Sequence, residues 1–268
     1  MNNGKIIKIT SDKLIYFNYS ENTIRTYIHY IKLFVNSFDK QYAHLNSDDF
    51  KCFLESFEYT SVSQQNQVIN AIKFLYKKVL NKKYAKIDFT RPRKEKRLPR
   101  IIEHKYLTSC INKIDNLKHK AIISLAYATG MRVSEVLNLK ISDIDSKRMI
   151  INVVQGKGRK DRIIPVKCDL LKLLRRYYIK YKPTKYIFNG QSNSVKYSST
   201  SCNNIVKKHI GKKYHFHLLR HSCLTYLLEN GTSLRHIQAI AGHMSSRTTE
   251  LYTHISVDNL SKIQMPII

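Results

Sequence analysis

The sequence contains little that would build a disulfide-rich or membrane-spanning protein. Its cysteines are odd in number and form no C-x-x-C pair, so neither a disulfide framework nor a cysteine zinc site is indicated. The longest uncharged apolar stretch, residues 121–131, is too short to cross a bilayer. The N-terminus lacks the apolar segment and cleavage site of a secretory signal. We therefore expect a cytoplasmic protein with reduced thiols at Cys52, Cys110, Cys168, Cys202 and Cys223.

Glycine and proline are also scarce, and neither occurs between positions 5 and 91. This absence removes the usual chemistry of hairpins and tight turns, so the first third of the chain is predicted to be helical. Apolar side chains recur at spacings of three and four over residues 24–38, 50–57 and 69–79. These stripes predict a small helical bundle. Residues 14–17 fit either a short helix or a strand.

Acidic residues are few, with 19 Asp and Glu against 47 Lys and Arg, which gives a net charge of +28 over 268 residues. Clustered positive charge releases counterions when it binds nucleic acid, so a polyanionic partner is favoured. The alternative is a protein that is merely basic.

Basic residues are concentrated in residues 89–101, where TRPRKEKRLPR holds six basic side chains and one acidic one. Two prolines stiffen this stretch, which predicts an extended linker between a helical domain at 1–88 and a second domain at 102–268. We expect the linker to run beside DNA phosphates, so that the two domains form a clamp; a solvated connector is the alternative. The expected DNA contacts in the linker are Arg91, Arg93, Lys94, Lys96 and Arg97.

The second domain combines helical patterns with two β-rich runs. Helices are predicted at residues 105–114, 118–129, 133–139, 201–209, 216–230 and 234–241, with a final pair around Tyr252. Gly130 supplies a C-cap for the second of these helices. Residues 149–154 and 162–166 flank a glycine-containing loop, which predicts a β-hairpin. The fold class is therefore mainly α, with a helical bundle followed by a mostly helical α+β domain that has a small antiparallel sheet.

Polar side chains gather where the predicted helix at 216–230 begins. His217, Arg220 and His221 are three and four residues apart and lie toward one side of that helix. Two histidines at this spacing resemble zinc ligands, but the glutamate of HExxH is missing and Arg220 would repel a cation. A phosphate site suits a guanidinium and imidazole donors better. A solvated His/Arg face is the third alternative.

Four further positions become informative in combination. Arg132 follows Gly130 at a helix start, and Glu135 is placed to hold its guanidinium. Lys157 lies in the hairpin loop, His243 follows Gly242 at a helix end, and Tyr252 comes nine residues later. Each alone has an ordinary structural interpretation, as a surface ion pair, a loop charge, a cap or a helix aromatic.

The order of these elements resembles the tyrosine recombinases of the phage-integrase and Xer type. The motifs are Arg132, GKGRKDR with Lys157, HLLRH, AGH and LYTH, all within residues 102–255. Residues 20–88 resemble the SAM-like helical core-binding domain of that family. The resemblance implies the DNA breaking-rejoining fold and the catalytic set Arg132, Lys157, His217, Arg220, His243 and Tyr252. We expect no additional N-terminal arm-binding domain, which favours a simple recombinase.

The resemblance also implies a mechanism. Tyr252 would attack the phosphodiester and form a 3′-phosphotyrosyl bond, while Arg132 and Arg220 clamp the nonbridging oxygens with His243 as a further donor. Lys157 would protonate the 5′ leaving oxygen, and His217 would act as general base. No metal, ATP or other cofactor is expected, as in type IB topoisomerase chemistry. Arg159 and Lys160 are expected to contact DNA.

The expected partners are double-stranded recombination sites and further copies of the chain. Four protomers would exchange strands through a Holliday junction, and the apolar C-terminal residues 257–268 would dock on a neighbouring protomer or on their own domain. Integration, excision, inversion and dimer resolution share this chemistry. The alternative functions are a non-catalytic architectural or regulatory DNA-binding protein and a metal-dependent nuclease.

Overall fold

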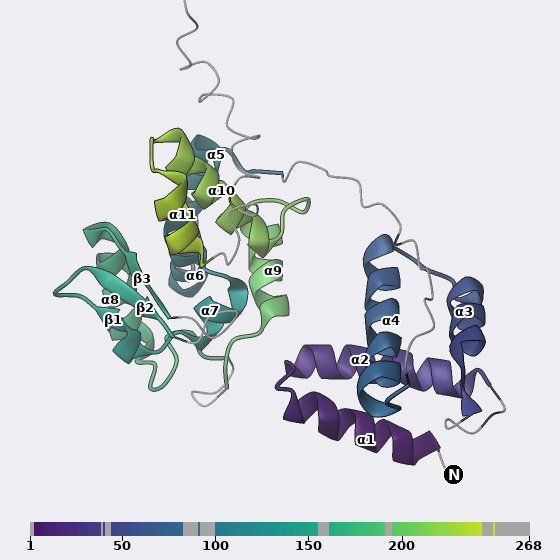
Figure 1. Cartoon of the computed structure of the whole chain (residues 1–268). Coiled ribbons are helices and arrows are strands. Elements are labelled where there is room, and N and C mark those ends of the chain that lie inside the picture. The colour runs from purple at the N-terminus through teal and green to yellow at the C-terminus, as the bar shows by residue number, and fades with distance from the viewer. Residues whose placement is uncertain are drawn as a thin grey trace, which may run out of the picture. The chain divides into compact units, whose positions relative to one another are not determined.

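The computed structural model describes residues 3–38, 40, 44–82, 91, 100–154, 161–190, 195–242 and 249. The chain forms two compact units, Met1–Lys96 and Arg97–Ile268 (Figure 1). Each has a hydrophobic core of its own. Within the described residues, no helix is both long and apolar enough to cross a membrane.

The first unit is a bundle of helices. Its elements are α1 (Asn3–Tyr16), α2 (Glu21–Asn36), α3 (Ser47–Ser56), α4 (Val62–Phe74) and a π-helical turn, η2 (Leu75–Val79). Ser20, Asn46 and Ser61 cap α2, α3 and α4 with their side-chain oxygens, which satisfies backbone N–H groups that have no partner inside a helix.

Aromatic rings fill the core of this bundle. Phe34 lies at its centre, with ring centroids at 5.2 Å from Phe53 and 6.1 Å from Tyr76, and Phe50 packs on both Phe34 and Tyr76. The helical prediction for the first third is confirmed. The segment 14–17 fitted either a helix or a strand, and residues 14–16 are in fact the last residues of α1. The buried residues of this helix are Ile6, Thr10 and Leu14, a stripe too narrow to predict the whole helix from the sequence.

The second unit is built around a buried helix. Its helices are α5 (His104–Asn112), α6 (Leu117–Thr129), α7 (Val133–Asn138), the 3-10 turn η3 (Ile141–Asp143), α8 (Cys168–Tyr181), α9 (Ser199–His209), α10 (Phe216–Glu229) and α11 (Leu234–Ala241). Helix α6 is apolar on nearly every side and packs against α5, α7, α8, α9 and α10. The predicted helices within this unit are confirmed to within two residues at each end, except for the pair around Tyr252, which lies outside the described residues.

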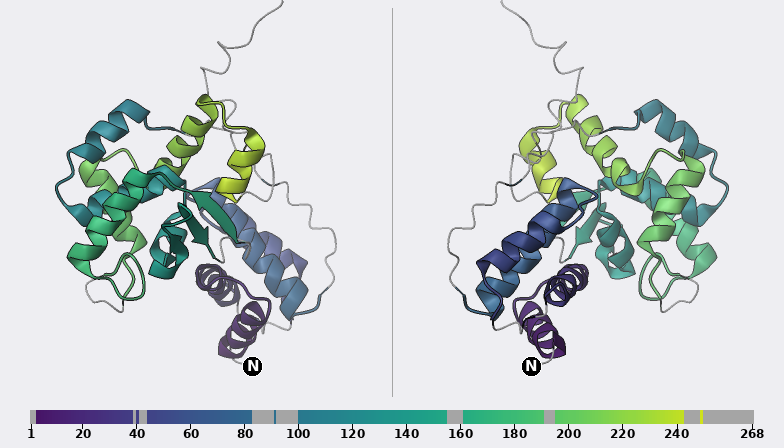
Figure 2. Two further views of the ribbon diagram at one scale, coloured as in Figure 1. Left: turned by 90° about the vertical axis from the view of Figure 1, so that its left-hand side faces the viewer. Right: turned by 90° about the vertical axis from the view of Figure 1, so that its right-hand side faces the viewer.

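A small sheet packs beside these helices (Figure 2). Strands β1 (Ile144–Asp145), β2 (Ile150–Val153) and β3 (Arg162–Pro165) are antiparallel in the order β1-β2-β3. Ile151 pairs with Ile164 and Val153 pairs with Arg162, so the predicted hairpin is confirmed. The mainly helical fold class with a small antiparallel sheet is therefore correct. The loop of the hairpin, residues 155–160, lies outside the described residues.

Helix α8 corrects the sequence analysis, which predicted no helix between residues 166 and 201. Leu170, Leu174 and Tyr177 are buried at positions i, i+4 and i+7, which is a regular helical stripe. Many of the positions between them are charged or exposed, so the stripe is narrow. The helical spacing of these apolar residues is present in the sequence, but the charged residues between them make it difficult to recognise.

Gly130 ends α6 in the left-handed conformation, with φ +61°, as predicted for a C-cap. A Cβ here would also lie 3.3 Å from Leu224 Cδ2 and 3.4 Å from Cys223 Sγ. Gly130→Ala is expected to lower the free energy of unfolding by about 2 kcal/mol or more, because conformational strain and crowding add.

Gly231→Ala is the matched control, since Gly231 also has a positive φ, +79°, but no atom lies within 4 Å of its added Cβ. It is expected to cost about 1 kcal/mol. Urea denaturation of both variants measures the difference. Equal losses would show that the contact with α10 contributes nothing.

Candidate active site

Three arginines converge on the C-terminal end of α11. The last carbonyls of a helix have no partner within it, and they carry the negative end of the helix dipole. Arg162 Nε donates to Ile240 O at 2.7 Å, Arg220 Nη2 donates to Ala241 O at 2.7 Å, and Arg132 Nη2 donates to Gly242 O at 3.3 Å. Residues 240–242 are thereby held by side chains from β3, from α10 and from the residue that precedes α7.

Arg220 is buried within this cluster. Its side chain lies on α10 with 2% of the residue exposed, and Nη1 donates to Gly130 O at 2.7 Å. Arg220 therefore joins the end of α6 to the end of α11. The alternative of a solvated His/Arg face is wrong for this residue, because α10 buries side chains on almost every side and not along one stripe.

Glu135 holds two of the three guanidinium groups. Its Oε1 accepts from Arg132 Nη1 and Arg162 Nη1, both at 2.9 Å. Its Oε2 accepts from the Arg132 backbone N–H at 2.8 Å and from Arg162 Nη2 at 2.7 Å. The predicted contact between Glu135 and the Arg132 guanidinium is thus present, and the carboxylate also caps the first turn of α7.

The charge of Glu135 is stabilised by these partners. Burial alone would raise its pKa, but the hydrogen bonds from Arg162 and from the Arg132 backbone, with the positive charge of Arg162, lower the pKa to about 2. The carboxylate is therefore ionised throughout the neutral range. This fixed negative charge offsets part of the repulsion between two neighbouring guanidinium groups.

Arg162 is the residue that sequence reasoning missed. It is the last residue of the GKGRKDR motif and the first of the predicted strand, and no role was predicted for its side chain, which is 8% exposed and binds both Glu135 and α11. Gly242 has φ +60°, and a Cβ on it would lie 3.2 Å from Arg162 Cδ and Nη1, so both the backbone conformation and the close contact favour a glycine here. No local pattern indicates the contact, because its partners are 27 and 78 residues away in the sequence.

The histidines of α10 lie beside this cluster. The rings of His217 and His221 meet edge to face with centroids 4.5 Å apart. Burial and then the Arg220 charge lower the pKa of His217, while burial and then His217 lower the pKa of His221 to about 4. Both rings are therefore neutral at pH 7, and a neutral His217 is able to accept a proton. In the described part of the chain, no three or more His, Cys, Asp or Glu side chains gather as metal ligands would.

The remaining predicted site residues are outside the part of the chain that the structure describes. They are Lys157, Arg159, Lys160, His243 and Tyr252 of the second unit and Arg93, Lys94, Lys96 and Arg97 of the linker. Arg91 is described, and its Nη2 donates to Asn70 Oδ1 of α4 at 3.0 Å. Gly242, which directly precedes His243, and Arg162, which lies five positions after Lys157, belong to the arginine cluster.

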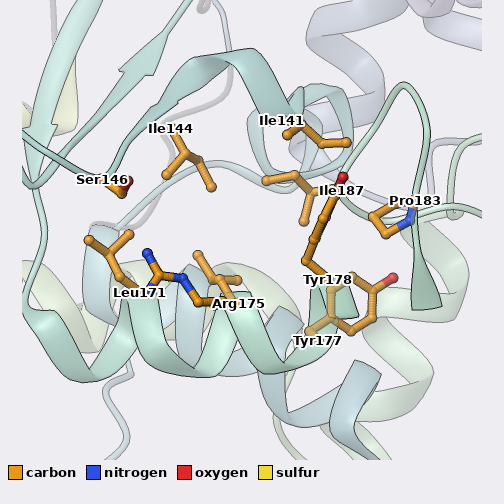
Figure 3. Close-up of a pocket in the computed structure, with 10 residues that line it drawn as sticks. Ile141, Ile144, Ser146, Leu171, Arg175, Tyr177, Tyr178, Pro183 and Ile187 are labelled. Carbon is orange, nitrogen blue, oxygen red and sulfur yellow. The ribbon is translucent and has the colours of Figure 1, made fainter. Parts of the chain in front are cut away.

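A separate pocket opens between α8 and the segment that holds η3 and β1 (Figure 3). Its volume is about 290 Å³, and Ile144, Leu171, Leu174 and Ile187 form most of its apolar wall, with Arg175 beside them. It shares no lining residue with the arginine cluster. The cluster at the end of α11 is the candidate active site, because it brings together Arg132 and Arg220, two of the residues predicted to bind the phosphate.

Both units match families of known proteins. Residues 95–258 match the phage integrase family, and residues 6–86 match the N-terminal SAM-like domain of phage integrases. The chain is 34% identical over 251 residues to tyrosine recombinase XerA of Pyrococcus horikoshii, covering 90% of this chain and 86% of that one. It is 28% identical to tyrosine recombinase XerC of Staphylococcus aureus, covering 92% and 91%.

Solved structures of recombinases have a similar fold. The crystal structure of XerA recombinase aligns over 97% of both chains with a TM-score of 0.56 and 28% identity. The XerH recombinase bound to its difH substrate aligns over 97% of this chain and 83% of that one, with a TM-score of 0.72 and 21% identity, which supports the fold. The chain belongs to the phage integrase family. It is a site-specific tyrosine recombinase, an enzyme that breaks and rejoins DNA.

The pKa of Glu135 predicts an acid-dependent contribution to stability. Its folded pKa of about 2 lies below the ordinary 4.5, so the stabilisation is fully present above pH 4.5 and is lost as the pH falls toward 2. The advantage of the wild type over Glu135→Gln is expected to shrink by up to roughly 3 kcal/mol across that window. Urea denaturation at several pH values measures it, and a difference that stays constant from pH 6 to pH 2 would contradict the ionised network.

Proposed function

We propose that the chain cleaves DNA by attack of the Tyr252 hydroxyl on a phosphodiester, which leaves a 3′-phosphotyrosyl bond and a free 5′ hydroxyl. The observation that carries this proposal is the convergence of Arg132 and Arg220 on Ala241 and Gly242, the first two residues of the AGH motif. Two guanidinium groups held in place by backbone carbonyls form a positively charged binding site of the kind that a phosphodiester requires.

Each side chain has a role set by its chemistry. A guanidinium carries five N–H groups in a planar fork, so an arginine that is anchored on a carbonyl can also donate to a phosphate. Arg132 and Arg220 bind the nonbridging oxygens, and His243 donates a further hydrogen bond. His217 takes the proton of the Tyr252 hydroxyl, and Lys157 gives a proton to the 5′ oxygen as it leaves.

The reaction conserves the energy of the bond that is broken. One phosphodiester is exchanged for a phosphotyrosyl ester, and attack by a 5′ hydroxyl then restores a DNA phosphodiester. The exchange therefore proceeds without ATP. Side chains of Arg132, Arg220, Lys157 and His243 supply the positive charge that a metal would otherwise provide.

DNA is the proposed partner of both units. Among the similar structures, XerH is bound to difH DNA, and the integrase of transposon Tn1549 is in complex with circular intermediate DNA. In this chain, residues 1–88 form the core-binding domain and the linker 89–101 runs along the phosphates, with Arg91, Arg93, Lys94, Lys96 and Arg97 as contacts. Arg159 and Lys160 bind DNA beside the catalytic residues of 102–268. The net charge of +28 supports this assignment.

Assembly on DNA completes the proposal. Four protomers bring two recombination sites together and exchange strands in pairs through a Holliday junction. Residues 257–268 hold Leu260, Ile263 and Met265 among other apolar side chains, which need burial, and they dock on a neighbouring protomer.

Covalent capture tests the nucleophile. The substrate is a nicked duplex built from the DNA that flanks the gene, with the nick placed so that cleavage releases a short fragment and religation fails. The wild type is expected to yield a protein–DNA adduct and Tyr252→Phe none, because only the phenolic oxygen can form the ester. Denaturing gel electrophoresis measures the adduct.

Tyr178→Phe is the matched control, since Tyr178 is exposed on α8 and outside the candidate site. It is expected to give the adduct yield of the wild type. An equal yield from Tyr252→Phe would falsify the assignment of the nucleophile, and no adduct from the wild type would favour a non-catalytic DNA-binding protein.

A second substrate tests the role of Lys157. Replacing the 5′ bridging oxygen by sulfur creates a leaving group that needs no proton. Lys157→Ala is expected to cleave the oxygen substrate roughly 100-fold or more slowly than the wild type and to recover most of that loss on the sulfur substrate. Lys172→Ala, an exposed lysine on α8, is the control. Lack of rescue would remove Lys157 from the role of general acid.

A further inference from the structure

Arg162 links α7 to the end of α11, two elements whose relative position matters for the proposed reaction. Its Nη1 and Nη2 bind the two oxygens of Glu135 at 2.9 and 2.7 Å, and its Nε binds Ile240 O at 2.7 Å. The helix that carries Glu135 and the end of α11 are therefore joined by one rigid guanidinium plane. In Figure 2 the end of α11 lies beside β3, and the two elements are in contact.

The backbone of Arg162 is fixed as well. Arg162 is the first residue of β3 and pairs with Val153 of β2, so this pair lies at the base of the hairpin loop. Lys157 stands five positions before Arg162 in the sequence. The side chain that holds Glu135 and α11 thus starts from the residue at which the Lys157 loop rejoins the sheet.

A lysine is unable to make the same link. The guanidinium presents a planar fork to the two carboxylate oxygens and a third donor to the carbonyl, whereas an ammonium is a single point charge. Gly242 packs so closely on Arg162 that a Cβ there would lie 3.2 Å from its side chain. Space on this side of the guanidinium is therefore limited.

We propose that Arg162 is a positioning residue for the recombination reaction: it sets the base of the Lys157 loop against Arg132 and the chain that leads to His243. This inference rests on the proposed function, because Lys157 acts there as the proton donor. Buried ion pairs add little net stability but do fix geometry, which suits such a role. Arg162 acts through other groups and makes no contact with the reacting atoms in this proposal.

Arg162→Lys is the test variant, and single-turnover cleavage of the nicked substrate is the measurement. The oxygen substrate is expected to be cleaved roughly 10- to 100-fold more slowly than by the wild type, because small misplacements of a proton donor are costly. The affinity for DNA is expected to stay within about threefold, since one positive charge is retained. On the 5′ sulfur substrate, which needs no proton, most of the loss is expected to disappear.

The ratio of rates on the two substrates separates positioning from stability. A variant that is partly unfolded loses the same fraction of activity on both substrates, so its ratio equals that of the wild type. Arg176→Lys, an exposed arginine on α8, is the matched control and is expected to keep both rates. Equal losses of Arg162→Lys on the oxygen and sulfur substrates, or no loss at all, would overturn the inference.

Adduct formation by the wild type distinguishes a failure of the positioning role from a failure of the proposed function. An adduct with the wild type and an unchanged ratio for Arg162→Lys would overturn the positioning role alone. A wild type that forms no adduct on either substrate would overturn the proposed function, and the positioning role with it.

Discussion

The carboxylate of Glu135 is the interaction on which the candidate active site depends. The chain has a net charge of +28, and the site places the guanidinium groups of Arg132 and Arg162 on the same carboxylate. Without a fixed negative charge between them, these groups would repel one another and turn toward solvent. Four donated hydrogen bonds and the charge of Arg162 keep Glu135 ionised despite its burial. One acidic residue therefore allows several cations to remain close together.

The end of α11 supplies the second constraint. Its last carbonyls accept hydrogen bonds from Arg162 and Arg220, and Gly242 accepts one from Arg132. The arginines donate hydrogen bonds to these carbonyls, and the same hydrogen bonds fix the orientation of the guanidinium groups. Because the AGH motif begins at Ala241, the same hydrogen bonds determine where the chain continues toward His243. Structure and proposed catalysis thus use the same three guanidinium groups, which explains why Arg220 is buried although it is charged.

Much of the fold follows from local pattern. The stripes of α2 and α3, the cap at Gly130 and the hairpin of β2 and β3 were all predictable, because each depends on residues close in the sequence. Helix α8 has a narrow stripe within charged positions and was missed. The contact of Glu135 with Arg132 was predictable from its spacing of three residues. The role of Arg162 was not, because it depends on how β3, α7 and α11 pack, and no periodicity encodes that packing.

A structure of Tyr252→Phe bound to its recombination site would test the central claim most directly. The account predicts that the scissile phosphate lies on Arg132 and Arg220 while Glu135 still joins Arg132 to Arg162 and the carbonyls of residues 240–242 keep their arginine donors. A phosphate bound elsewhere, or a complex in which Arg132 and Arg220 reach the phosphate only after leaving Gly242 and Ala241, would contradict it.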